Sequence, residues 1–155
     1  MSAALEQASA ELLARLTKEE ALPIASGPTR ELGGVARVSA KLEKLLRLAL
    51  DDIARAQGTT ADELLAKSCN PPVLLRRATA GQLIRVLKKL SATPAARRSH
   101  VRALMKELAV HPNKISRVVD ARNDVLHGSE EPAAARAVIQ ALRVFVERYR
   151  RDAAW

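Results

Sequence analysis

Aromatic residues are almost missing from this sequence of 155 residues, which contains one Phe, one Tyr and one Trp. Modules that bind RNA by stacking bases on aromatic side chains need several such rings on one surface, so this shortage argues against them. The single cysteine, Cys69, excludes an internal disulfide and a zinc site built from cysteines. We expect a free thiol in a reducing compartment.

Long apolar runs are missing as well. No segment approaches the ~20 consecutive apolar residues that a membrane-spanning helix needs. The first residues, M-S-A-A-L-E-Q, have neither the basic head nor the apolar run of a signal peptide. We therefore expect a cytoplasmic protein that has no contact with a membrane.

Positive charge is in excess, and it is unevenly distributed. The net charge is +9. Residues 1–75 carry 9 Lys/Arg and 10 Asp/Glu, whereas residues 76–155 carry 17 Lys/Arg and 7 Asp/Glu. Such asymmetry favours a polyanionic partner, with nucleic acid first. The alternative is a solvated basic surface that has no partner.

The remaining composition is typical of helices, because Ala, Leu, Arg, Glu and Lys dominate. Apolar residues recur at helical spacing over residues 4–22 and 35–57 and, with breaks, to the end of the chain. Prolines and glycines interrupt the pattern over residues 23–34. The sequence therefore predicts an all-α fold, an antiparallel helical bundle over residues 35–155. An extra N-terminal helix and a linker, residues 1–34, would dock on this bundle or on a second chain.

Helix boundaries are marked by recognisable signals. Gly58 is expected to end the helix over residues 35–57. Thr60 and Thr79 each begin a predicted capping box at the start of a short helix. Pro94 and Pro132 stand where proline is tolerated, at a helix start. The residues expected to face the core are Leu5, Leu12, Leu13, Leu16, Val38, Leu42, Leu45, Leu46, Ala49, Leu50, Ile53, Leu83, Ile84, Leu87, Leu90, Val101, Leu104, Met105, Leu108, Val138, Ile139, Leu142, Phe145, Val146 and Tyr149.

Residues 114–128, K-I-S-R-V-V-D-A-R-N-D-V-L-H-G, break the helical pattern at one position. Arg122 falls in the middle of an apolar stripe, where a guanidinium needs a cleft or a partner. His127 follows one turn after Asn123, which could hold the imidazole in one orientation. The alternatives are an arginine that extends to solvent at an edge and a histidine that caps a helix.

The string R-N-D-V-L-H-G, residues 122–128, resembles the signature of the HEPN superfamily: an Arg, a small polar residue, a short spacer and a His. Its two apolar residues before the His and the Gly after it are similar to those of HEPN ribonuclease toxins and defence proteins. The resemblance implies a helical bundle, a homodimer, and RNA cleavage without a metal where two copies of the motif meet. Ser129 stands where one branch of the family has a Tyr that an antitoxin modifies.

On this interpretation Arg122, Asn123 and His127 are the catalytic residues, no cofactor is needed, and an antitoxin or another regulatory protein is a possible partner. Histidine suits proton transfer near neutral pH, and arginine matches phosphate oxygens. The predicted RNA contacts are Arg98, Arg102, Lys106, Arg117, Arg136 and Arg143, and Arg150 continues the row of the last two. No metal site is expected, since His100 and His111 stand as edge and loop histidines without a second ligand at metal-site spacing.

Three functions follow in order of preference. The first is a metal-independent endoribonuclease of toxin or anti-phage defence type. The second is a catalytically silent HEPN-like module that binds RNA or a protein. The third is a small DNA-binding protein, since the two short helices from Thr60 to Leu90 resemble a helix-turn-helix, although the connection between them is long for that motif. Asp120 and Asp124, one turn apart, are a rival nuclease site that would use a metal.

Overall fold

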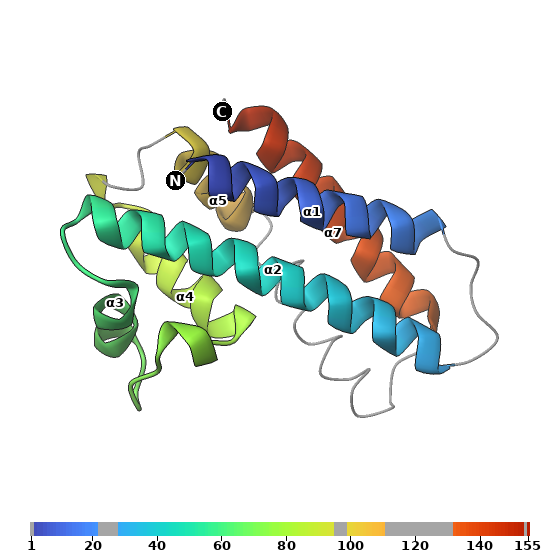
Figure 1. Cartoon of the computed structure of the whole chain (residues 1–155), viewed down its shortest axis with the longest axis horizontal. Coiled ribbons are helices and arrows are strands. Elements are labelled where there is room, and N and C mark those ends of the chain that lie inside the picture. The colour runs from blue at the N-terminus through green and yellow to red at the C-terminus, as the bar shows by residue number, and fades with distance from the viewer. Residues whose placement is uncertain (1, 22–27, 95–98, 111–131, 154) are drawn as a thin grey trace.

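The computed structural model describes residues 2–21, 28–94, 99–110, 132–153 and 155. Within these ranges every regular element is a helix (Figure 1). The elements are α1 (Ser2–Ala21), α2 (Pro28–Ala56), α3 (Ala61–Ser68), the 3₁₀ helix η1 (Leu75–Arg77), α4 (Ala80–Leu90), α5 (Ser99–Val110) and α7 (Pro132–Asp152). The predicted all-α fold is confirmed.

Helix α2 lies at the centre of the bundle, where it contacts α1, α3, α4 and α7. Helix α1 packs against both α2 and α7 and runs antiparallel to them (Figure 1). Helix α5 packs on α4 and α7. The N-terminal helix therefore docks on the bundle of its own chain, which was one of the two expected arrangements.

The core is one continuous apolar cluster that includes residues from α1 to α7. Most of its largest fully buried side chains come from the predicted stripes, as with Leu12 of α1, Leu46 of α2 and Leu87 of α4, whereas Leu65 of α3 was not predicted. All predicted core residues of α5 and α2 are buried, while Leu13 and Leu90 are half-buried and pack against the cluster. Val138 lies outside the side chains that the structure describes. Helical periodicity therefore identified most of the core of the long helices but missed Leu64, Leu65 and Val86.

The predicted linker over residues 23–34 is wrong in its second half, because α2 begins at Pro28 and continues through both glycines. Gly34 lies inside α2 and does not form a turn. The space where its side chain would be is occupied by Glu19. A Cβ on Gly34 would lie 2.7 Å from Oε2 of Glu19. The buried Glu19 carboxylate binds Arg15 and Arg37, at 3.4 and 3.1 Å, and so joins α1 to the start of α2.

The boundaries at Gly58, Thr60 and Thr79 follow the predicted signals, whereas the described part of α5 begins at Ser99 and not at Pro94. Gly58 has φ +71°, and the N–H groups of Gly58 and Thr59 donate to the carbonyls of Arg55 and Ala54, which is a Schellman end. Thr60 accepts a hydrogen bond from the Glu63 N–H at the start of α3. Thr79 and Gln82 form the full capping box of α4. Local sequence therefore determines these ends.

The long helices are amphipathic throughout the described chain. Arg37, Lys44 and Arg55 are exposed on α2, as are Arg148 and Arg151 on α7, each opposite a buried stripe. None of the described helices is both long enough and apolar enough to cross a membrane.

Candidate functional site

The predicted catalytic residues Arg122, Asn123 and His127 lie outside the described residues, as do Arg117 and Arg98. The two helices that flank the motif segment are described. Helix α5 ends at Val110 and α7 begins at Pro132, and these two helices pack against each other. The segment with the predicted site thus connects two neighbouring helices of the bundle.

The predicted RNA contacts on α5 are accessible. Arg102 and Lys106 are exposed and stand four residues apart, on one side of the helix. Lys106 Nζ lies 3.6 Å from Oδ2 of Asp152, a loose surface pair. Arg102 forms no ion pair with the described residues. Both cations are therefore available to a ligand from solvent.

The predicted contacts on α7 are already engaged within the chain. Arg143 donates to the carboxylates of Glu20 on α1 and Glu147 on α7. The hydrogen bond to Glu20, followed by that to Glu147, raises the pKa of Arg143 above its ordinary value. Arg150 donates to the Glu6 carbonyl at 2.8 Å and to Ser9 Oγ at 2.6 Å. These arginines tie α7 to α1, and RNA binding by Arg143 stays a prediction.

Arg136 is half-buried near the start of α7 and also has an interaction partner within the chain. The row that the sequence predicted along α7 therefore differs from the pair on α5. Its members have partners within the chain, whereas Arg102 has no ion pair among the described residues and Lys106 has only the surface pair with Asp152. Among the predicted contacts, those on α5 are the better placed for a polyanion.

A polar cluster that sequence reasoning missed joins α2, α5 and α7. Nε2 of His100 lies 3.0 Å from Oδ2 of Asp52, whose side chain is 1% exposed. The His100 side chain is only 13% exposed, so the expected edge histidine is largely covered. A signal was present in the sequence, since Asp52 follows Leu45 by seven residues and Ala49 by three and so shares their buried face.

The rings of Trp155 and Tyr149 complete this cluster. Trp155 stacks on His100, with centroids 6.1 Å apart, and meets Tyr149 edge-on at 5.5 Å. Burial, assisted by the nearby Asp52 charge, raises the pKa of Tyr149. Within the described chain the Tyr149 hydroxyl has no hydrogen-bond partner. A histidine covered by a tryptophan and held by a buried carboxylate is suited to join helices, not to meet a substrate.

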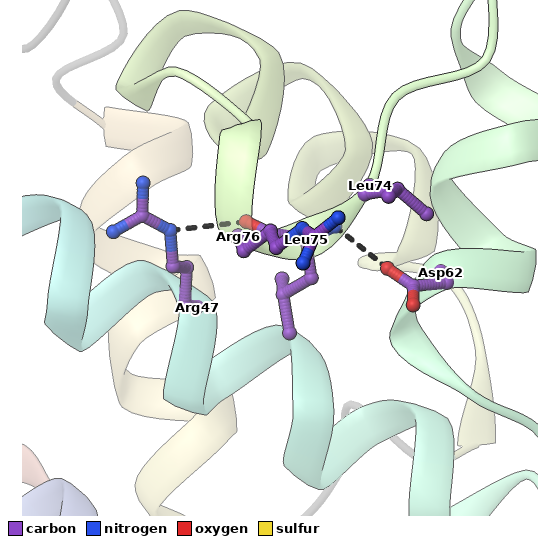
Figure 2. A pocket seen from close by; sticks show the side chains of 5 residues that line it. All are labelled: Arg47, Asp62, Leu74, Leu75 and Arg76. Atoms are coloured by element: carbon purple, nitrogen blue, oxygen red, sulfur yellow. Dashed lines mark hydrogen bonds between the residues drawn. The ribbon is translucent and has the colours of Figure 1, made fainter.

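Two further chemical features are clear for the described residues. They contain no group of three or more His, Cys, Asp or Glu side chains arranged to hold a metal ion. They do form an open cleft of about 480 Å³, lined by Arg47, Asp62, Leu74, Leu75 and Arg76 (Figure 2). This cleft lies where η1 passes between α2 and α3.

No protein-family model matches the sequence, and searches of curated proteins and of solved structures found no match. The functional argument therefore depends on the residues of this chain and on their arrangement.

Proposed function

We propose that this protein is a metal-independent endoribonuclease of HEPN type that acts in the cytoplasm as a toxin or in anti-phage defence. The string R-N-D-V-L-H-G over residues 122–128 carries the proposal. The all-α bundle supports it, because the motif segment follows α5 and precedes α7, which pack together in that bundle.

The proposed chemistry divides between His127 and Arg122 of the motif. His127 removes the proton of the ribose 2′-hydroxyl and, from a second copy, protonates the leaving 5′-oxygen. Arg122 stabilises the charge that develops on the phosphate. Asn123 keeps the imidazole in one orientation. A two-fold homodimer supplies both histidines at one composite site, and an antitoxin or other regulatory protein would act by blocking that site.

Exposed cations on α5 support RNA as the substrate. Arg102 and Lys106 lie on the helix that leads directly into the motif segment. The residues that would bind phosphates therefore precede the proposed cleavage residues by only about twenty positions in the chain. A catalytically silent RNA-binding module would use the same cations, and the two functions differ only in whether RNA is cut.

The deciding experiment is cleavage of a mixed pool of RNA by the purified protein in excess chelator. The expected products carry a 2′,3′-cyclic phosphate and a 5′-hydroxyl, and the rate is bell-shaped in pH because one His127 is neutral while the other is charged. His127→Ala should lower the rate on the order of a hundredfold or more, as should Arg122→Ala, and Asn123→Ala should lower it less.

His111→Ala is the matched control, because it removes a histidine with no predicted role and should leave the rate unchanged. Activity that depends on a divalent metal, or products that carry a 5′-phosphate, would assign the chemistry to Asp120 and Asp124 instead. RNA binding without any cleavage would favour the silent binding module.

A further inference from the structure

The positive excess of this chain is confined to a shorter segment than its second half. Residues 64–106 contain ten of the 26 Lys/Arg and none of the 17 Asp/Glu. The other residues together are net −1, with 16 Lys/Arg against 17 Asp/Glu. Residues 107–155, which include the motif, carry 8 Lys/Arg and 7 Asp/Glu. The charge that would attract a polyanion therefore precedes the motif and lies mostly outside it.

Ion pairing divides the bundle in the same way. On α1, α2 and α7, acidic side chains neutralise many of the cations, as Glu11 does for Lys41 and Lys44 and Glu20 does for Arg143. On η1 and α4 the exposed cations are Arg76, Arg77, Arg85 and Lys89. None of these four has an ion-pair or hydrogen-bond partner among the residues that the structure describes. We call this set the basic ledge.

Two anchors hold the η1 part of the basic ledge in place. From α2, Arg47 donates through Nε to the Leu75 carbonyl at 3.1 Å and through Nη2 to the Ala78 carbonyl at 3.0 Å. From the start of α3, Asp62 Oδ1 accepts a hydrogen bond from the Leu75 N–H at 2.6 Å (Figure 2). Arg76 and Arg77 thus project from a backbone that is fixed before any ligand binds, which lowers the entropy cost of binding.

The α4 part of the basic ledge is equally well supported. The full capping box at Thr79 fixes the first turn of α4, and Leu83, Ile84 and Leu87 bury its inner face. Arg85 and Lys89 are one turn apart on the exposed side, so their Cα atoms are separated by about 6 Å along the axis. They form a row of two cations on a rigid helix that contacts α5.

The cleft beside Arg76 adds an apolar element to the basic ledge. Leu74 is 45% exposed and lines this cleft together with Arg76 (Figure 2). A nucleotide chain presents phosphates and the flat apolar faces of its bases to one surface. Arg76, which lines the cleft, would bind a phosphate, and the exposed Leu74 beside it would contact the face of a base. The other cations of the basic ledge would bind further phosphates.

We propose that the basic ledge, which is separate from the motif segment in sequence, is a docking surface for RNA. It binds the phosphate backbone while the motif cuts elsewhere on the same molecule. The choice of RNA over DNA rests on the proposed function, whereas the phosphate chemistry does not. No aromatic side chain occurs on η1 or α4. The basic ledge should therefore bind with little preference for base sequence.

The test compares two quadruple variants that remove the same charge. The ledge variant carries Arg76→Gln, Arg77→Gln, Arg85→Gln and Lys89→Gln. The control carries Lys18→Gln, Lys44→Gln, Arg55→Gln and Arg151→Gln, all exposed on α1, α2 and α7. Both are made in a His127→Ala background so that RNA stays intact. Fluorescence anisotropy measures the affinity for a short labelled RNA over a range of salt concentrations.

The ledge variant should bind about tenfold or more weakly than the His127→Ala parent at physiological salt, and its slope of log affinity against log salt should fall by about 3, roughly 0.7 for each lost contact to a single strand. The control should stay within about twofold, since Lys44, Arg55 and Arg151 are already paired and Lys18 lies on α1, outside the basic ledge. A single Leu74→Gln variant should lose affinity without a change of slope.

Equal losses in both quadruple variants would overturn the proposal, because affinity would then follow net charge alone. Tighter binding to a DNA duplex of the same sequence, or binding only to an acidic protein, would overturn it as well. The readout is binding, so it is independent of whether the wild-type protein cleaves RNA. A wild type that binds RNA through the basic ledge but does not cut would refute the proposed function and leave the docking surface for RNA, without its link to cleavage.

Discussion

His100 and Asp52 stand 48 residues apart in the sequence and meet at 3.0 Å, Nε2 to Oδ2, inside the bundle. The pair joins α5 to the central helix α2. Trp155, three residues after the end of α7, stacks on the histidine, so residues from three parts of the bundle meet at this contact. Removal of Asp52 would leave the largely covered His100 ring without this hydrogen-bond partner, which makes this contact a test of how the bundle is held together.

Asp52→Ala should destabilise the fold by about 1–3 kcal/mol, as the loss of a buried hydrogen-bonded group usually does. The neighbouring residue supplies the control. Asp51 forms a surface pair with Arg55, and Asp51→Ala should cost less than about 0.5 kcal/mol. Urea unfolding followed by Trp155 fluorescence gives both values. Equal stability of the two variants would show that the Asp52–His100 contact contributes nothing.

Tyr149 predicts a specific loss of stability at alkaline pH. Burial raises its pKa in the folded protein above the ordinary value of 10.0, so above pH ~10 the unfolded state releases the phenolic proton first and stability falls as pH rises. The limiting slope is about 1.4 kcal/mol per pH unit. Tyr149→Phe should remove this slope, measured as urea midpoints between neutral and alkaline pH.

The same substitution should be close to neutral in stability at pH 7, because the Tyr149 hydroxyl is buried without a partner among the described residues. This is the only tyrosine in the sequence. Absorbance near the phenolate band therefore reports its ionisation alone, and the native protein should show none until it unfolds. Ionisation at the ordinary pKa in the folded state would contradict the burial of this side chain.

Gly34 and Glu19 should behave as a coupled pair. Alanine favours helices over glycine by about 1 kcal/mol, but a Cβ at Gly34 would press on the carboxylate of Glu19, which must then leave Arg15 and Arg37. Gly34→Ala should therefore be neutral or destabilising in the wild type, and stabilising by about 1 kcal/mol when Glu19 is already Ala. The measurement is a double-mutant cycle of unfolding free energies, and additive effects would exclude the contact.

How far the sequence predicts this structure depends on whether a feature is local. The helices, their caps and the inward faces were predictable, since each depends on residues within one or two turns, such as Thr79 with Gln82. The role of Gly34 was not predictable. In the sequence, a glycine that leaves space for a distant carboxylate cannot be distinguished from a glycine that ends a helix. The Asp52–His100 pair was missed for a similar reason, although the place of Asp52 on an apolar face signalled burial.

The candidate site divides in the same manner. A string of seven residues predicts Arg122 and His127 as a catalytic pair. The distance from this pair to its copy in the proposed dimer depends on quaternary structure, which the spacing of residues within one chain does not encode. The partners of Arg143 also come from α1, more than a hundred residues away. The spacing of basic residues along each helix therefore predicted RNA binding for both Arg143 and Arg102. In the structure Arg143 has two carboxylate partners, whereas Arg102 has no ion pair among the described residues.

That difference gives the last prediction. Arg102 is exposed without an ion-pair partner among the described residues, so Arg102→Gln should weaken RNA binding while leaving unfolding free energy within about 0.5 kcal/mol. Arg143 joins Glu20 to Glu147 across the contact of α1 with α7, so Arg143→Gln should lower stability more than Arg102→Gln does and change RNA affinity little. Each variant is the control for the other, because each removes one arginine charge. Anisotropy with labelled RNA and urea unfolding measure the two quantities on the same samples.

If Arg143→Gln instead weakens binding as much as Arg102→Gln without destabilising the fold, its carboxylate partners must release it to the RNA, and α7 then belongs to the binding surface.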